Sequence, residues 1–163
     1  MLTPVAAGDV PALQRLLEQD PEYFARVDRA PVRPDEAEQT LADRPPNLPL
    51  ERKHVFVVHA HELGALDAVV DLLAAYPDAD TWYLGLIFIA PARRGAGLGT
   101  RLVEATCELV RARGGRALRL AVAVANPDAR RLYERLGFHH VERRSRTGWN
   151  GAVIDCDVMQ RRL

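Results

Sequence analysis

Residues 82–102 read WYLGLIFIAPARRGAGLGTRL, and this is the most informative stretch of the chain. The run from Trp82 to Ile89 is almost wholly apolar and rich in aromatic and branched residues, which predicts a strand buried on both faces. Pro91 cannot donate a ladder hydrogen bond, so the strand ends before it. From Gly97 onward, apolar residues recur at helical spacing and predict an amphipathic helix. We therefore expect a strand–turn–helix unit at the centre of the molecule.

The turn itself is built for close approach to a ligand. Gly95, Gly97 and Gly99 stand at alternate positions, where glycine lets several backbone N–H groups converge on one point. The first N–H groups of a helix have no partners within it, and the helix dipole adds partial positive charge there. Three arginines between positions 93 and 101 add formal charge. The pattern favours an anion cradle for phosphate, and a glycine-rich connection with exposed arginines is the alternative.

Two common phosphate-binding motifs do not fit this turn. A Walker loop needs a lysine directly after its last glycine, and the chain has one lysine, Lys53, far from the turn. A dinucleotide fingerprint needs the spacing G-x-G-x-x-G and an acidic residue at the end of the next strand. Here the spacing is G-x-G-x-G, and the next strand ends at Ala125-Asn126.

Two sequence blocks carry a family resemblance. Arg94 to Gly99 spell R-x-x-G-x-G, and Asn126 to Phe138 read NPDARRLYERLGF, which matches the pattern N-x-x-A-x-x-L-Y-x-x-x-G-F. In this order and at this separation, the blocks resemble the acetyl-CoA site of the GNAT superfamily of N-acetyltransferases. The resemblance is strong from Trp82 to Phe138 and weak before that stretch.

The resemblance implies one α/β domain over residues 1–163. Its mixed central β-sheet would contain splayed parallel strands and be flanked by helices, with acceptor-side helices in residues 1–50 and the acetyl-CoA-binding core in residues 81–138. The pattern along the rest of the chain agrees with that order. Strands are predicted at 2–5, 54–58, 65–72, 117–124, 139–144 and 152–159, and helices after Asp9, at 22–27, at 35–42 and after Asn126, with a hairpin turn at 61–64.

Composition narrows the function classes. The 163 residues suit one domain, and 48% hydrophobic with 27% charged residues is ordinary for a soluble globular protein. Twenty-two basic and 22 acidic residues give a formal net charge of zero, which argues against nucleic acid or a membrane surface as partner. No membrane-spanning run or signal peptide is seen, so we expect a cytoplasmic protein, and the dominance of arginine over lysine favours a bacterial source.

No metal site is expected. Cys107 and Cys156 lack metal-ligand spacing, and two reduced, packed thiols are the default. His59 and His61 flank a hairpin turn, and the adjacent pair at 139–140 points to opposite faces of a strand.

The resemblance also assigns cofactor contacts. Acetyl-CoA would lie between the strands Trp82–Ile89 and Ala117–Val124. Backbone groups of Phe88 and Ile89 would pair with the pantetheine arm, and one of their N–H groups would polarise the thioester carbonyl. The pyrophosphate would be held by the N–H groups of Arg94, Gly95, Ala96, Gly97, Leu98, Gly99 and Thr100.

Asn126 and Tyr133 are seven residues apart, about two turns, and share a helix face. By resemblance, Asn126 binds the pantetheine and Tyr133 is the general acid that protonates the departing thiolate. Each has a structural alternative: Asn before Pro127 is a standard helix cap, and Tyr133 can pack beside its apolar neighbours. Gly137 and Phe138 are predicted to form a left-handed C-cap and its hydrophobic contact.

The general base is not evident. Many relatives carry a glutamate in the middle of the strand before the glycine turn, and that position here is Gly85. The strand offers no acid or histidine, only the phenol of Tyr83. A proton can instead pass through ordered water to a more distant carboxylate, for which Asp71 and Asp80 are the candidates. The alternative for both is a solvated strand-end or loop carboxylate.

The resulting hypothesis is an acyltransferase that acetylates a primary amine by direct attack in a ternary complex. No cysteine is expected near the splayed strands. The acceptor, a small molecule or a peptide amine, would contact residues 13–42 and the loop around Tyr76, with Tyr23, Phe24 and Asp35 as candidate contacts. A homodimer is possible. One alternative is a non-catalytic acyl-CoA sensor or partner module, and a second is a nucleotide-binding α/β protein.

Overall fold

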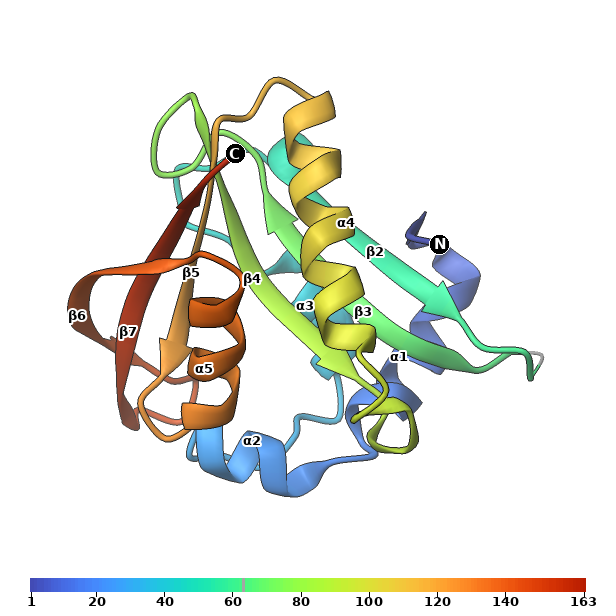
Figure 1. Cartoon of the computed structure of the whole chain (residues 1–163). Coiled ribbons are helices and arrows are strands. Elements are labelled where there is room, and N and C mark those ends of the chain that lie inside the picture. The colour runs from blue at the N-terminus through green and yellow to red at the C-terminus, as the bar shows by residue number, and fades with distance from the viewer. Residues whose placement is uncertain (63) are drawn as a thin grey trace.

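A mixed sheet of seven strands runs through the computed structural model, which describes residues 1–62 and 64–163 (Figure 1). The strand order is β1-β2-β3-β4-β5-β7-β6. β4 and β5 are parallel, and the other neighbours pair antiparallel. The strands are β1 (Thr3–Pro4), β2 (Lys53–His59), β3 (Leu66–Leu73), β4 (Thr81–Ile89), β5 (Ala117–Ala123), β6 (His139–Thr147) and β7 (Val153–Arg162).

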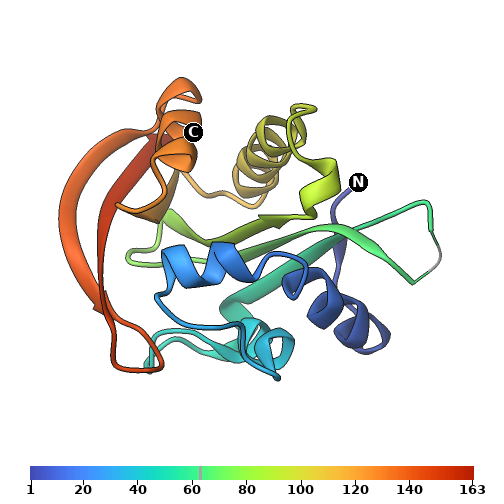
Figure 2. The same cartoon turned by 90° about the horizontal axis from the view of Figure 1, so that it is seen from below.

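Helices cover both faces of the sheet (Figure 2). One face carries α1 (Val10–Leu17), α2 (Pro21–Val27) and α3 (Glu36–Ala42), and the other carries α4 (Leu98–Ala112) and α5 (Pro127–Arg135). Three short 3₁₀ helices, at Ala7–Asp9, Leu50–Arg52 and Pro91–Arg93, connect these elements. Each face has its own hydrophobic core, with Leu13, Leu16 and Phe88 in the first and Leu102, Val110 and Leu118 in the second.

This architecture confirms the predicted single α/β domain with a mixed sheet and most of the predicted elements. Two local expectations differ. Asp9 precedes α1, but its carboxylate accepts from the N–H of Ala6 at 2.9 Å and makes no capping hydrogen bond to the helix. The first strand is reduced to Thr3–Pro4. Of the turn predicted at 61–64, Leu63 lies outside the described residues.

β4 and β5 separate halfway along their length. Their pairing runs from Thr81 opposite Ala117 to Leu84 opposite Leu120, and both strands continue past that point. On its other side, β4 carries one extra residue, Gly85, where the register with β3 shifts beside Asp71. A bulge of this kind bends a strand and increases its twist. The splay therefore begins where the bulge turns β4 away from β5.

The strand–turn–helix unit forms as the sequence predicts. Pro91–Arg93 make a 3₁₀ turn after β4, and Gly95 and Gly97 then adopt φ angles of +80° and +76°. Such positive values suit glycine, because a Cβ clashes in the left-handed region. α4 follows directly and ends before Gly114, where φ is again positive at +85°.

None of the helices in the described ranges is long and apolar enough to cross a bilayer.

Candidate functional site

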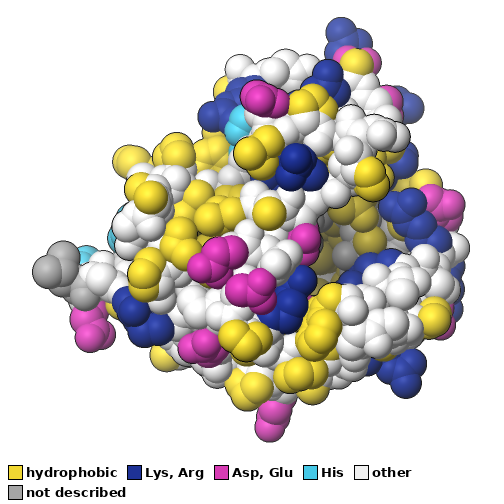
Figure 3. Space-filling model, turned by 180° about the vertical axis from the view of Figure 1, so that it is seen from behind, with side chains coloured by type: hydrophobic (Ala, Val, Ile, Leu, Met, Phe, Trp, Pro, Cys, Tyr) yellow, Lys and Arg dark blue, Asp and Glu magenta, His cyan; other side chains and the backbone are white. Residues whose placement is uncertain are grey.

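Two cavities meet where β4 and β5 separate. A cleft of about 440 Å³, called here the large cleft, is bounded by α2, α3, β4, β5, α5 and the β6–β7 turn. A pocket of about 140 Å³, called here the small pocket, lies between the end of β4, the start of α4 and α5. Ile87, Ala129 and Tyr133 line both. Figure 3 shows the hollowed face, with hydrophobic, acidic and basic side chains gathered around it.

The glycine turn borders the small pocket and presents unpaired backbone donors. The N–H of Arg94 donates to the Pro91 carbonyl at 3.2 Å, within the 3₁₀ turn. In the part of the chain that the structure describes, the N–H groups from Gly95 to Thr100 donate to no protein acceptor. The available donors therefore begin one residue later than predicted, and they converge at the N-terminus of α4.

Carboxylates distant in the sequence reach the arginines of this turn. Arg94 Nη1 lies 2.5 Å from Asp20 Oδ2 at the start of α2, and Arg93 Nε lies 3.2 Å from Asp67 Oδ2 on β3. Arg101 Nη1 donates to the Ala96 carbonyl, within the turn itself, at 3.1 Å. The positive charge of the turn is therefore partly compensated, and its anion-binding capacity rests mainly on the backbone N–H groups.

The open edge of β4 presents backbone groups to the splay. The N–H of Ala90 donates to the Asp67 carbonyl on β3 at 2.9 Å, and Ile89 O accepts from Arg94 Nε on the other side. Because alternate residues of a strand direct their backbone groups to opposite sides, Ile87 and Ile89 face the opening. Phe88 directs its backbone groups toward β3, so of the two residues predicted to contact pantetheine only Ile89 faces the opening, together with Ile87.

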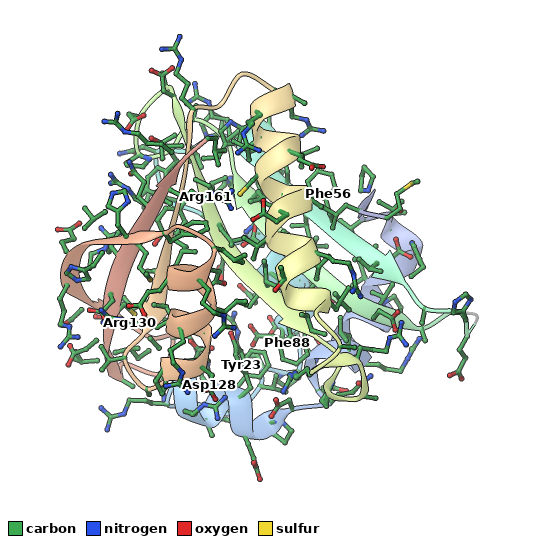
Figure 4. The ribbon with its side chains drawn as sticks, viewed as in Figure 1. Tyr23, Phe56, Phe88, Asp128, Arg130 and Arg161 are labelled. Carbon is green, nitrogen blue, oxygen red and sulfur yellow. The ribbon has the colours of Figure 1, made fainter. Side chains whose placement is uncertain are left out.

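The side chain of Phe88 joins β4 to α2. It is 1% exposed, with Tyr23 edge-on at 5.3 Å and Phe24 stacked at 5.8 Å between ring centroids. The guanidinium of Arg94 lies 5.4 Å from the Phe88 ring centroid. Figure 4 shows Tyr23 and Phe88 beside each other at the end of the splay. These contacts place Tyr23 and Phe24, two of the candidate acceptor contacts, in the wall of the large cleft.

α5 brings Asn126 and Tyr133 to the splay. Asn126 Oδ1 accepts from the N–H of Ala129 at 3.5 Å, so Asn126 caps the helix while it lines the large cleft. Tyr133 lies between the two cavities, its ring edge-on to Phe138 at 5.5 Å. Burial raises the pKa of the Tyr133 phenol to about 12. The hydroxyl is therefore protonated at neutral pH and can serve as a proton donor.

The predicted cap after α5 is present. Gly137 has a φ of +80°, and the N–H of Phe138 donates to the Tyr133 carbonyl at 3.0 Å. Phe138 is 3% exposed and packs against the ring of Tyr133. The C-cap thereby fixes the end of the helix that carries the phenol.

Asp71 is a buried carboxylate at the edge of the large cleft. Its Oδ2 lies 2.8 Å from Lys53 Nζ, and the two side chains are 11% and 3% exposed. Within the described chain, Asp71 Oδ1 has no hydrogen-bond partner. Burial raises the pKa of Asp71 to about 6, although Lys53 opposes that shift. Asp71 therefore changes its charge close to neutral pH, which suits a group that accepts a proton.

Gly85 and Asp71 occupy adjoining space. A Cβ built on Gly85 would lie only 2.5 Å from Asp71 Oδ2. The carboxylate of β3 thus occupies the space into which a side chain at position 85 of β4 would project. Asp80, the other candidate base, is exposed in the loop before β4 and lines neither cavity.

The large cleft includes charged residues that sequence reasoning missed. Arg33 Nε lies 2.9 Å from Glu36 Oε2, its Nη2 lies 3.4 Å from Asp43 Oδ2, and Arg146 pairs with Asp28. These pairs lie on α3, in the loops flanking it and on β6. Arg146 and Asp28 are 118 positions apart in the chain, so no local pattern could have linked them.

The β6–β7 turn closes one side of the large cleft. Asn150 Nδ2 donates to the Arg29 carbonyl at 3.0 Å, and Arg29 Nη1 donates to the Val153 carbonyl at 3.3 Å. Trp149, 55% exposed, lines the cleft from the same turn. Among the predicted acceptor contacts, Asp35 does not line the cleft. Tyr76 is also outside it, packed against Tyr83 at 5.6 Å between ring centroids.

Cys156 also lines the large cleft, where the sequence pattern predicted no cysteine. The side chain is buried on β7, and burial raises the pKa of its thiol. Thiolates are the nucleophilic form of cysteine, so this environment disfavours an acyl-cysteine intermediate.

Comparisons with known proteins agree with this geometry. A model of the Acetyltransferase (GNAT) family matches residues 12–138. A mycothiol acetyltransferase of Beutenbergia cavernae is 34% identical over 84 residues, which are 52% of this chain and 28% of that protein. The chain therefore corresponds to well under two thirds of that relative's length.

Solved structures share the fold over nearly the whole chain. An acetyltransferase from Thermus thermophilus has a TM-score of 0.77 and 26% identity, covering 100% of this chain and 96% of its own. A spermidine N-acetyltransferase from Vibrio cholerae, solved with CoA and spermine, has a TM-score of 0.75 and 22% identity, covering 99% and 94%.

Proposed function

Since the chain belongs to the GNAT acetyltransferase family, we propose that it transfers an acetyl group from acetyl-CoA to a primary amine within a ternary complex. The observation that carries this proposal is the meeting of two cavities at the splay, with Tyr133 between them and Asp71 at the edge of the large cleft. Direct transfer within a ternary complex needs this arrangement, because donor and acceptor must be bound together and reach one reacting centre from separate sites.

The small pocket and the glycine turn fit acetyl-CoA, the donor that enzymes of this family use. The unpaired N–H groups from Gly95 to Thr100, backed by the dipole of α4, suit its pyrophosphate. The backbone groups of Ile87 and the N–H of Ile89 suit the amides of its pantetheine arm, beside the Ile89 carbonyl that accepts from Arg94. The predicted contact of Asn126 is compatible with that path, since Asn126 lines the large cleft. Acetyl-CoA supplies the activated thioester.

The residues of the splay account for the proton movements of the transfer. The amine nitrogen bonds to the acetyl carbon, the carbon–sulfur bond breaks, and the proton of the amine passes through water to Asp71. Tyr133 donates its proton to the departing thiolate. Afterwards Tyr133 regains a proton from solvent, and Asp71 releases its proton to solvent. An N–H on the open edge of β4 polarises the carbonyl as charge develops on its oxygen. Direct attack agrees with a protonated thiol at Cys156.

The acceptor binds in the large cleft under this proposal. About 440 Å³ suits a small molecule or the end of a flexible chain. Tyr23, Phe24 and Trp149 offer aromatic contacts, and the tie between the β6–β7 turn and Arg29 closes one side. We infer that the amine enters this cleft end-on and reaches the splay beside Asp71.

Thiol release from acetyl-CoA, measured across a panel of small amines and peptide N-termini, tests the proposal. Amine-dependent release with intersecting double-reciprocal plots is expected, and Cys156→Ala should keep it. Parallel plots together with loss of release in Cys156→Ala would point to an acyl-enzyme instead. Acetyl-CoA binding by calorimetry without release for any amine would identify a non-catalytic acyl-CoA-binding module, an alternative that the absence of a carboxylate at position 85 of β4 supports.

A further inference from the structure

We propose that Lys53 is a positioning residue for the transfer, and that it holds the Asp71 carboxylate, ionised, in the space that Gly85 leaves open. This inference rests on the proposed function and deepens it. Lys53 touches neither cavity, since it lines neither the large cleft nor the small pocket. Its effect on the reaction therefore passes through Asp71.

The contacts of Lys53 fix its ammonium at one point. Nζ donates to Asp71 Oδ2 at 2.8 Å and to the Asp43 carbonyl at 2.7 Å, and the side chain is only 3% exposed. The first partner lies on β3 and the second follows α3, so the ammonium bridges the sheet and the helical layer. A buried ammonium costs solvation free energy unless it is paired, and this one has both a carboxylate and a carbonyl. It is the single lysine of the chain.

Gly85 completes the arrangement from the opposite side. The bulge places this extra residue of β4 against Asp71, where a Cβ would come within 2.5 Å of Oδ2 and 3.2 Å of Cγ. Gly85 has no positive φ, so its backbone conformation does not require glycine. Steric room for the carboxylate is the reason that the surrounding side chains give for glycine at this position.

The charged groups that face Asp71 come from few elements. Lys53 on β2 stabilises its ionised form, and Asp43, after α3, opposes ionisation. Asp43 in turn accepts from Arg33, which also binds Glu36 on α3. From β4, residues 84–86 contribute no titratable group. Lys53 is thus the cation in direct contact with the carboxylate.

The decisive experiment compares Lys53→Met with wild type by two independent titrations. The ¹³C shift of the Asp71 carboxyl carbon reports its pKa without turnover, and the acidic limb of kcat/KM for acetyl transfer reports the same group in catalysis. Loss of the ammonium should raise the Asp71 pKa from the carbon titration and the pKa of the kinetic acidic limb by about one pH unit or more, because the desolvation of Asp71 is then unopposed. Activity lost near neutral pH should return in Lys53→Met at higher pH, a recovery that a merely structural role would not produce.

Arg52→Met is the matched control. This neighbouring cation is exposed and hydrogen-bonds the Ala75 carbonyl, not Asp71, so neither titration should move. Lys53→Arg keeps the charge and should give values nearer wild type than Lys53→Met. If Lys53→Met does not fold, Lys53→Gln takes its place in both titrations. The proposal would be overturned if the Asp71 pKa were unchanged in the lysine variant. It would also be overturned if the pKa from the carbon titration rose while the pKa of the acidic limb of kcat/KM stayed at the wild-type value.

A double-mutant cycle tests the role of Gly85. Gly85→Ala should lower kcat about tenfold or more by displacing the carboxylate from the reacting centre. In an Asp71→Ala background the same change should have no further effect, because no carboxylate is left to displace. Additive losses would overturn this part of the proposal. Thiol release itself, the test of the proposed function, fails or succeeds separately from the carbon titration.

Discussion

The two sides of the splay are built in different ways. The small pocket and the glycine turn come from short, continuous stretches of chain, and their binding groups are mainly backbone N–H groups. The large cleft is lined by side chains from helices, strands and loops throughout the fold, and its charged pairs join positions up to 118 residues apart. The comparison teaches that a backbone site is encoded locally, whereas a side-chain site is encoded by tertiary packing. Variants on each side should therefore affect different kinetic constants.

The largest effect is expected for Asp71→Asn on the large-cleft side. Removing a general base costs about 10²- to 10⁴-fold in kcat. In wild type, activity should rise as pH increases through about 6, because Asp71 accepts a proton only when ionised and its pKa is raised to that range. The variant should lose this acidic limb and keep the wild-type Kd for acetyl-CoA, measured by calorimetry. An unchanged limb would mean that another group is the base.

Tyr133→Phe should reduce kcat about 10²-fold, since the proton donor is lost while the ring remains. The packing of the ring against Phe138 is kept, so the melting temperature should stay near wild type. Tyr133 borders both cavities, so this variant tests whether the large cleft and the small pocket serve one reacting centre. Pre-steady-state thiol release measures the chemical step directly. A loss confined to KM for either substrate would assign Tyr133 to packing.

Gly97→Ala should weaken acetyl-CoA binding about tenfold and leave kcat nearly unchanged. Alanine at a φ of +76° costs roughly 1–2 kcal/mol and shifts the turn that aligns the N–H groups. Gly114→Ala is the matched control, because φ is +85° there, nothing lies within 4 Å of the new Cβ, and the residue follows the far end of α4. Both variants should lose similar stability, and only Gly97→Ala should raise KM for acetyl-CoA. Equal effects on KM would show that α4 transmits the strain.

The mixed sheet was implied by the family resemblance and by the order of the predicted strands and helices. The sequence by itself was sufficient for the glycine turn and the α5 block, because each depends on glycine, proline or apolar spacing within one stretch. It also identified Asp71 as a candidate base, although its reason, a carboxylate at a strand end, was generic. The ion pair between Lys53 and Asp71 joins residues 18 positions apart and depends on the pairing of β2 with β3, so no spacing rule could indicate it. The partial neutralisation of Arg94 by Asp20 was missed for the same reason, since the two residues are 74 positions apart.

The smallest effect is expected for Asp20→Asn, at the contact that joins the two sides. Burial raises the pKa of Asp20, but hydrogen bonds from Arg94 and from the N–H of Tyr23 outweigh that effect and hold the pKa below its usual range. Asparagine still caps α2, so only the partly exposed ion pair is lost, and the free energy of unfolding should fall by about 1 kcal/mol or less. Arg94, freed from its carboxylate, should then bind acetyl-CoA up to about fivefold more tightly. Weaker binding in calorimetry would show instead that Asp20 orients Arg94 for the ligand, and the two sides would then be coupled through that pair.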